Sequence, residues 1–286
     1  MSDSGNGNHP GIRATEPRKR TPGSKPILIL AILFVAATCL AWYFSWFGRE
    51  LSDADITTYL ADEHKPRHVQ HALSLIQKRI ERGDVSAKNW YPQLITLSGH
   101  QETEFRLTVA WLMGFDNKSP EFHEALLKLV KDPEPIVRRN AALALVRFND
   151  HSGREELLAV LKPYPIKAPA DGVVQSLKEG ATFGRRTLVS RVQQTDDKVI
   201  EVRSPFPGRI NKIVKPNGSQ VSRDEEVLTL ISDEGSVYEA LRGLSLIGTK
   251  DDLPLVQTYA TSQDASPRVK EQAALTTKAI ESRNTD

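Results

Sequence analysis

The sequence is poor in sulfur: its 286 residues include one cysteine and two methionines. The single cysteine, Cys39, excludes a disulfide within one chain and a metal site built from several thiolates. Common enzyme motifs are also missing, among them a nucleophile elbow, a phosphate-binding glycine loop, a zinc-protease motif and a paired-carboxylate arrangement. We therefore predict that the protein is not an enzyme, and that it has no catalytic residue and no cofactor.

The chain also lacks a strong charge excess, since its formal net charge is +2 at pH 7. Basic residues gather in the first 25 residues, whereas basic and acidic residues nearly balance after residue 50. A nucleic-acid-binding domain normally shows a clustered basic excess. We therefore expect no nucleic acid and no small-molecule substrate as partner of the body.

One long uncharged stretch lies near the N-terminus. Residues 1–25 are rich in Gly, Ser, Pro and basic residues, which predicts a disordered cytoplasmic tail. The 21 residues 27–47 have no charge, and a helix of that length matches a bilayer core of about 30 Å. Basic residues before it and aromatic residues at its end predict an uncleaved transmembrane helix over 26–48, with the body periplasmic or otherwise extracytoplasmic. A cleaved signal peptide and a lipoprotein anchor at Cys39 are the alternatives, and neither fits an apolar run that continues through aromatic residues.

A period of 33 residues dominates the body. Ser86, Ser119 and Ser152 have this spacing and each opens a short amphipathic segment, so we predict that they are helix N-caps. A second class of helix repeats with the same spacing, at the paired positions Thr108 and Ala141, and Ala240 and Ala273. Two helices per unit at this period predict an α-solenoid.

The segment DPEPIVRRNAALALVRFND, with its Asp-Pro turn and paired alanines, resembles a HEAT repeat. RVKEQAAL near the C-terminus is similar to the same signature. The resemblance implies stacked helix pairs that present an extended surface to other proteins. In such an array we expect Arg138 and Arg139 to make capping contacts to neighbouring turns, and Trp90, Trp111 and Phe115 to be buried.

A different pattern interrupts the repeats and occurs twice. IKAPADGVV and VRSPFPGRI share a Pro-x-x-Gly turn, formed by Pro169 and Gly172 and then by Pro205 and Gly208. Each copy predicts a tight hairpin in which glycine supplies a positive φ. The pair resembles the two halves of a biotinyl/lipoyl-type barrel-sandwich domain, as found in carrier proteins and, unmodified, in periplasmic adaptor (membrane-fusion) proteins.

The size of the interruption fits an insertion within one repeat. Ala141 and Ala240 are 99 residues apart, which is three periods where adjacent repeats need one. The predicted fold is therefore a multidomain α + β chain, in which an α-solenoid of HEAT repeats is interrupted by a small all-β barrel-sandwich domain and preceded by one transmembrane helix. Its segments are a tail at 1–25, the transmembrane helix at 26–48, solenoid at 51–163, the lipoyl-like insertion at 166–231 and solenoid at 234–283.

Three residues are candidates for chemistry. Lys198 lies in the link between the two halves, where the resemblance places the modified lysine of a carrier, but its spacing from Ser204 differs by one from the lipoyl pattern and methionines do not flank it. His64, His68 and His71 have helical spacing, but Pro66 is expected to start the helix after His64. His68 and His71 therefore remain as candidate metal ligands on one helical face. A solvated hairpin charge and a polar helix face are the simpler interpretations, so we assign neither a cofactor nor a metal.

The preferred functional hypothesis is a membrane-anchored, non-enzymatic scaffold or adaptor in an envelope transport or export system. It would bind proteins of the cell envelope through the solenoid and an unmodified lipoyl-like module. The alternatives are a biotin or lipoyl carrier subunit modified at Lys198, and a ligand-binding sensor. The predicted localisation is a single-pass membrane protein with a cytoplasmic N-terminus and a periplasmic body.

Overall fold

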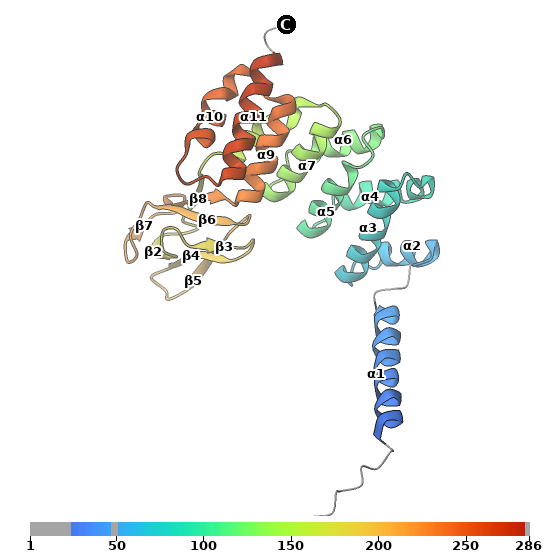
Figure 1. The fold of residues 1–286 in the computed structure, drawn as a ribbon. Coiled ribbons are helices and arrows are strands. Elements are labelled where there is room, and N and C mark those ends of the chain that lie inside the picture. Colours follow the sequence, from blue (N-terminus) through green and yellow to red (C-terminus); the bar gives the residue numbers. More distant parts are fainter. Residues whose placement is uncertain (1–23, 47–50, 284–286) are drawn as a thin grey trace, which may run out of the picture. The chain divides into compact units, whose positions relative to one another are not determined.

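A computed structural model of the chain describes residues 24–46 and 51–283 (Figure 1). The chain divides into a first unit, Met1–Glu50, and a second, compact unit, Leu51–Asp286. The described part of the first unit is helix α1 (Ser24–Trp46). The predicted tail lies almost entirely outside the described residues, as do the side chains of the aromatic residues at the end of the apolar run.

The transmembrane prediction is wrong. A span requires about 20 consecutive, predominantly apolar residues. Within residues 24–46 and 51–283, no helix combines the length and the apolar character needed to cross a membrane. This finding overturns the predicted helix over 26–48 and the single-pass localisation that depends on it.

Pairs of antiparallel helices make up most of the second unit, and short 3₁₀ turns precede some of them (Figure 1). The first helices of the pairs are α2 (Asp53–Ala61), α4 (Tyr91–Ser98), α6 (Pro120–Leu129), α8 (Arg154–Val160) and α10 (Leu253–Thr261). The second helices are α3 (Pro66–Glu81), α5 (Thr103–Met113), α7 (Pro135–Arg147), α9 (Glu234–Ile247) and α11 (Pro267–Arg283). The 3₁₀ turns are η1 (Val85–Trp90), η2 (His151–Gly153) and η3 (Lys250–Asp252).

The helices begin where a side chain accepts hydrogen bonds from the unpaired N–H groups of the first turn, or where proline removes one of these groups. Ser119 caps α6 as predicted, because its hydroxyl accepts from the Phe122 N–H at 3.3 Å. The predicted caps at Ser86 and Ser152 are wrong: each donates its own N–H to the aspartate two residues earlier, Asp84 at 2.9 Å and Asp150 at 2.6 Å. An aspartate satisfies the orphan donors and adds a negative charge near the positive helix end.

Small residues allow the second helices to pack closely. Ala141, Ala240 and Ala273, which the 33-residue period relates, are at most 1% exposed. Two hydrophobic cores run through the array, one from Leu51 to Leu145 and one formed by α8 to α11 with parts of α7. The helical part therefore agrees with the predicted stacking of repeats.

The inserted segment forms eight short strands in two sheets. They are β1 (Tyr164–Lys167), β2 (Gly172–Ser176), β3 (Thr182–Phe183), β4 (Leu188–Gln193), β5 (Val199–Arg203), β6 (Gly208–Ile213), β7 (Gln220–Val221) and β8 (Glu226–Ser232). The strand orders are β1-β8-β6-β3 and β5-β4-β2-β7, and all pairs are antiparallel. Both sheets contribute to one core that includes Val174, Val192, Phe206 and Leu230.

The predicted closed barrel-sandwich is therefore wrong, and so is the fold class built on it. A barrel closes only when its outermost strands pair with one another. Here β1, β3, β5 and β7 each have a single neighbouring strand, so both sheets keep two open edges. The sheets also belong to the same compact unit as the helices instead of standing as a separate body.

The chain enters and leaves the sheets at one place, between α8 and α9. The Ser232 hydroxyl at the end of β8 donates to the Val160 carbonyl at the end of α8, at 3.1 Å. Asp233 then caps α9, accepting from the Ser236 N–H at 3.1 Å. The sheets are thus inserted at the turn between the two helices of one pair.

Candidate protein-interaction surface

Lys198 lies in the turn between β4 and β5. Its N–H donates to the Asp196 carboxylate at 3.2 Å, and its carbonyl accepts from the Gln194 N–H at 2.8 Å. The side chain is exposed. These contacts explain the tight turn and place Lys198 in solvent.

His68 and His71 lie on α3, where the sequence predicts them. His68 Nδ1 is 2.9 Å from the Asp62 carboxylate, and its ring stacks on Tyr59 at 4.2 Å. His71 meets the same tyrosine ring edge-on at 6.1 Å. Among the described residues there is no group of three or more His, Cys, Asp or Glu side chains placed to bind a metal.

Two aromatic rings and an arginine form a cluster at the C-terminal ends of α5 and α7. The Arg147 guanidinium on α7 lies 4.5 Å from the ring centre of Phe115 and 5.0 Å from that of Trp111 on α5. The two rings meet edge-on at 5.6 Å. Trp111 is 36% exposed, which contradicts its predicted burial, whereas Trp90 is 2% exposed as predicted. Phe115 is half-buried.

The exposed surface continues onto α9 and α11. Arg147 and Leu246 are three periods apart and occupy equivalent positions, as do Arg242 and Leu275, which are one period apart. Leu246 is 60% exposed and Leu275 is 55% exposed. Burial and the nearby charge of Arg242 lower the pKa of Arg147. We call Trp111, Arg147, Arg242, Leu246 and Leu275 the second-helix face.

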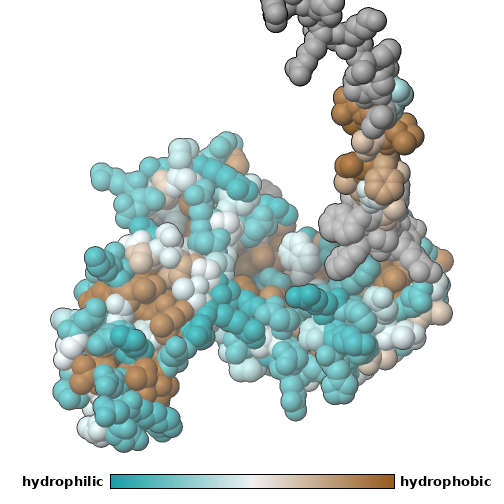
Figure 2. Space-filling view, turned by 90° about the horizontal axis from the view of Figure 1, so that it is seen from below, coloured by the Kyte–Doolittle hydropathy of each residue, from teal (hydrophilic) through white to brown (hydrophobic). Residues whose placement is uncertain are grey.

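On the side seen in Figure 2, the surface of the second unit is mostly polar. The view of the second unit in Figure 2 is largely hydrophilic, with hydrophobic side chains in smaller separate areas. Isolated exposed hydrophobic residues are normal, but groups of them with aromatic and arginine side chains are typical of interfaces.

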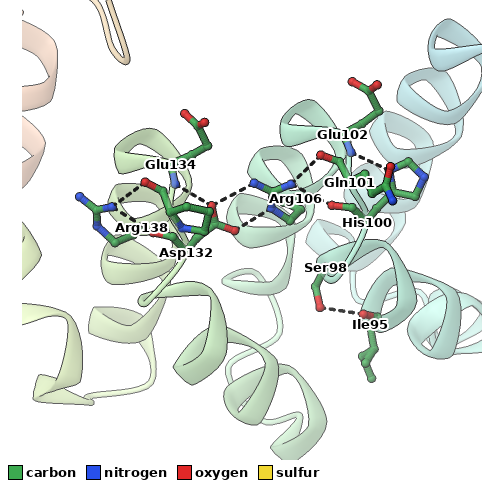
Figure 3. A network of polar contacts seen from close by, with 10 residues as sticks. Ile95, Ser98, His100, Gln101, Glu102, Arg106, Asp132, Glu134 and Arg138 are labelled. Carbon is green, nitrogen blue, oxygen red and sulfur yellow. Dashed lines mark hydrogen bonds and ion pairs between the residues drawn. The ribbon is translucent and has the colours of Figure 1, made fainter. Parts of the chain in front are cut away.

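Ion pairs at the turns fix the spacing of the helices that form this face (Figure 3). Arg106 on α5 reaches the next turn, where both oxygens of the Asp132 carboxylate accept at 2.6 and 3.0 Å. The same guanidinium donates to the carbonyls of His100 and Gln101 in its own turn, at 2.8 and 2.9 Å. Asp132 and Arg106 are largely buried, so this bidentate pair is a rigid link between repeats.

Arg138 on α7 repeats the arrangement one repeat further along. It donates to the Asp132 and Pro133 carbonyls at 2.9 and 3.1 Å, which confirms the predicted contact with a turn, and to Glu156 at 2.8 Å. The prediction for Arg139 is wrong. This residue is 5% exposed, and its guanidinium lies 3.7 Å from the ring centre of Phe206 in the inserted sheets.

Polar pairs also link successive first helices at the opposite turns. The pairs are Tyr91 with Asp116 at 2.8 Å, His123 with Asp150 at 2.6 Å, and Arg154 with Asp252 at 2.9 Å. Burial and the bond to Asp116 raise the pKa of Tyr91. The recurring turn aspartates Asp84, Asp116 and Asp150 lie 32 and 34 residues apart, a signal that the strict 33-residue comparison missed.

Comparison with known proteins supports the helical part of this description. A family model described as HEAT repeats matches residues 91–177, which include α4 to α8 and the first two strands. The match confirms the HEAT-repeat prediction, and HEAT repeats suggest a protein-interaction scaffold. It gives no support to the predicted biotinyl/lipoyl-like domain.

No curated protein matches the chain. Among solved structures 17 chains match, one of them the crystal structure of an engineered protein from the Northeast Structural Genomics Consortium. That protein is 14% identical, each chain is covered over 79% of its length, and the TM-score is 0.41. A likeness at this level supports no argument about function.

Proposed function

We propose that the protein is a non-enzymatic scaffold that binds a protein partner through the second-helix face. The observation that supports this most directly is the half-exposed cluster of Trp111, Phe115 and Arg147. Trp and Arg are enriched among the residues that dominate binding energy at interfaces, because they combine large apolar contact area with a polar group.

The charges of the cluster favour a partner with a carboxylate. Arg147 donates to the Gly114 carbonyl at 3.4 Å, and its cation lies against aromatic rings. Arg242 is paired with Glu239 at 3.3 Å, on the surface. A carboxylate from the partner would pair with Arg147, while separate apolar side chains along the partner would pack on Trp111, Leu246 and Leu275.

Links between the repeats prepare the face for binding. The Arg106–Asp132 and Arg138–Glu156 pairs set the distance between α5, α7 and α8 before any partner arrives. A preformed surface loses less conformational entropy on association than a mobile one. The array therefore serves as a rigid support for the face.

The proposal is tested by site-specific crosslinking in the native host. A photoreactive amino acid replaces Leu246 on the face or, as the control, Val85 on η1, which is 78% exposed. We expect one discrete crosslinked protein from position 246 and not from position 85. Trp111→Ala should then weaken binding of that protein at least about tenfold, or roughly 1.4 kcal/mol. The same crosslinks from both positions, or an unchanged affinity of the Trp111 variant, would overturn the proposal.

A further inference from the structure

A groove of about 700 Å³ separates the inserted sheets from the last helices of the array. One wall consists of β3, β6 and β8 of the sheet β1-β8-β6-β3, and the other consists of α9, α10 and the turn before α11. Both walls belong to the same compact unit. The volume lies in the range typical of binding sites, which is about 300–1,000 Å³.

The floor of the groove is apolar. Its buried or half-buried side chains are Leu161, Phe183, Ile231, Val237, Leu255 and Val269. Tyr259 stands beside them and donates its hydroxyl to the Leu161 carbonyl at 2.8 Å, so its ring faces the groove with the polar end already bonded. Such a floor favours an apolar side chain from a ligand.

Acidic groups predominate at the rim. Asp233, Glu234 and Asp264 line it together with one basic residue, Arg209. Glu234 accepts from the Ser266 hydroxyl, and Arg209 lies 3.9 Å from the Asp264 carboxylate, which is 81% exposed. An exposed pair at this distance is weak and yields readily to a competing cation. The rim therefore favours a ligand with positive charge.

An open strand edge favours a peptide as that ligand. Thr182 and Phe183 form β3, which has β6 as its single neighbour and lines the groove. The free side of an edge strand presents backbone donors and acceptors that an extended chain can pair with. The hydroxyls of Thr258 and Ser262 are on the opposite wall.

We propose that this groove binds an extended segment of a partner protein in which an apolar side chain is flanked by lysine or arginine. The apolar side chain enters between Phe183, Val237 and Leu255, and the flanking cations meet Glu234 and Asp264. The site is distinct from the second-helix face and goes beyond the proposed function, because it selects a short linear sequence.

Fluorescence anisotropy with the full chain and four labelled synthetic peptides tests the proposal. The peptides have a Leu-Phe centre flanked by lysines, by glutamates or by serines, and a fourth has lysines around a serine centre. We expect the lysine-flanked apolar peptide to bind at least tenfold more tightly than each of the other three. Equal binding of the glutamate-flanked peptide, or no binding of any peptide, would overturn the proposal.

Charge reversal at the rim locates the binding. Glu234→Lys and Asp264→Lys change exposed side chains and should each weaken the lysine-flanked peptide at least fivefold while strengthening the glutamate-flanked one. Thr258→Trp, also at an exposed position, should block both by filling the groove. Glu124→Lys on the exposed side of α6 is the matched control and should change nothing. If the control weakens binding as much as the rim variants, the attraction is a general charge effect and the groove is not the site.

The outcome is separable from the proposed function. Trp111→Ala should leave peptide affinity unchanged, because Trp111 does not line the groove. Loss of peptide binding in that variant would assign the peptide to the second-helix face and refute the groove.

Discussion

Two glycines at equivalent places in the inserted segment both lie where a neighbouring strand approaches too closely for a side chain. The sequence pattern assigns Gly172 and Gly208 the same role, a positive φ in a turn. Gly172 has φ of +155°, and a Cβ there would also lie 2.3 Å from the Gln193 carbonyl oxygen on β4. At Gly208 the reason is space alone, because a Cβ there would lie 2.1 Å from the Ile231 carbonyl oxygen on β8. No side chain accommodates such a contact unless the two strands move apart.

Gly208→Ala should therefore destabilise the protein by about 2–4 kcal/mol. The backbone fixes both the added Cβ and the Ile231 carbonyl oxygen, so no side-chain rotation relieves the clash. Gly180→Ala is the control, because φ there is +79° and nothing lies within 4 Å of an added Cβ. It should cost only about 1 kcal/mol of backbone strain. Urea unfolding of both variants compares the two costs. Equal destabilisation would show that β6 and β8 move apart at little cost and that their close approach does not require Gly208.

The contact that Arg139 makes could not be predicted from the sequence. Its neighbour Arg138 makes the contact expected of a HEAT repeat, whereas the partner of Arg139 is Phe206, distant in the chain and part of a different pattern. Burial lowers the pKa of Arg139 to about 10, and its Nε and Nη1 atoms have no hydrogen-bond partner. The cation is thus held against the ring at the contact between helices and sheets.

At the scale of single elements, the helices follow local rules that the sequence displays. These rules are the apolar period, the prolines in first turns and the small residues at Ala141 and Ala240. Each concerns residues of one helix or of the helix next to it in the chain. Strand pairing in the insertion depends on residues that are far apart in the chain. The local hairpins could therefore be predicted from the sequence, whereas whether the two sheets close into a barrel could not. The exposed Trp111 was missed for a similar reason, because an aromatic residue at a repeat position can face either the core or solvent.

Asp150, one of the turn aspartates, should make the stability of the protein depend on pH. Burial alone would raise the pKa of Asp150, but hydrogen bonds from Ser152 and His123 lower it below its ordinary value of 3.8. Because the folded-state pKa is depressed, the stabilisation is present above about pH 4 and is lost as the pH falls through the folded pKa.

Asp150→Ala should accordingly cost about 1–2 kcal/mol at pH 7, by removing the cap of η2 and the bond to His123. The difference from the unaltered protein should shrink in denaturant titrations below pH 3.8. Asp251→Ala, at an exposed aspartate in η3, is the control and should change stability by less than about 0.5 kcal/mol. A difference that stays constant down to pH 2 would contradict the assigned role of the carboxylate.

For the whole molecule, the central question is whether the helical array depends on the sheets. The contact between them includes Ile136, Tyr164 and the Arg139–Phe206 pair. The helices have their own two cores. We expect the array to fold without the sheets but with lower stability.

Replacing residues 164–232 by a short Gly-Ser link between Pro163 and Asp233 tests this dependence. The shortened chain should keep a helical circular dichroism spectrum and one cooperative transition, with Tm lowered by roughly 5–15 °C through loss of these contacts. Shortening only the exposed turn at 194–198 is the control and should leave Tm within about 2 °C. A molten or aggregated product, beside a folded control, would mean that the sheets are required for the helical core.

The hydrogen bond between Ser232 and Val160 also has a mechanical consequence. Because the sheets leave the array where they enter it, tension applied across the second unit would pass directly between α8 and α9 through their packing. The sheets would bear load only after those two helices separate. We therefore expect the sheets to unfold after α8 and α9 separate when force is applied to the two ends of the second unit.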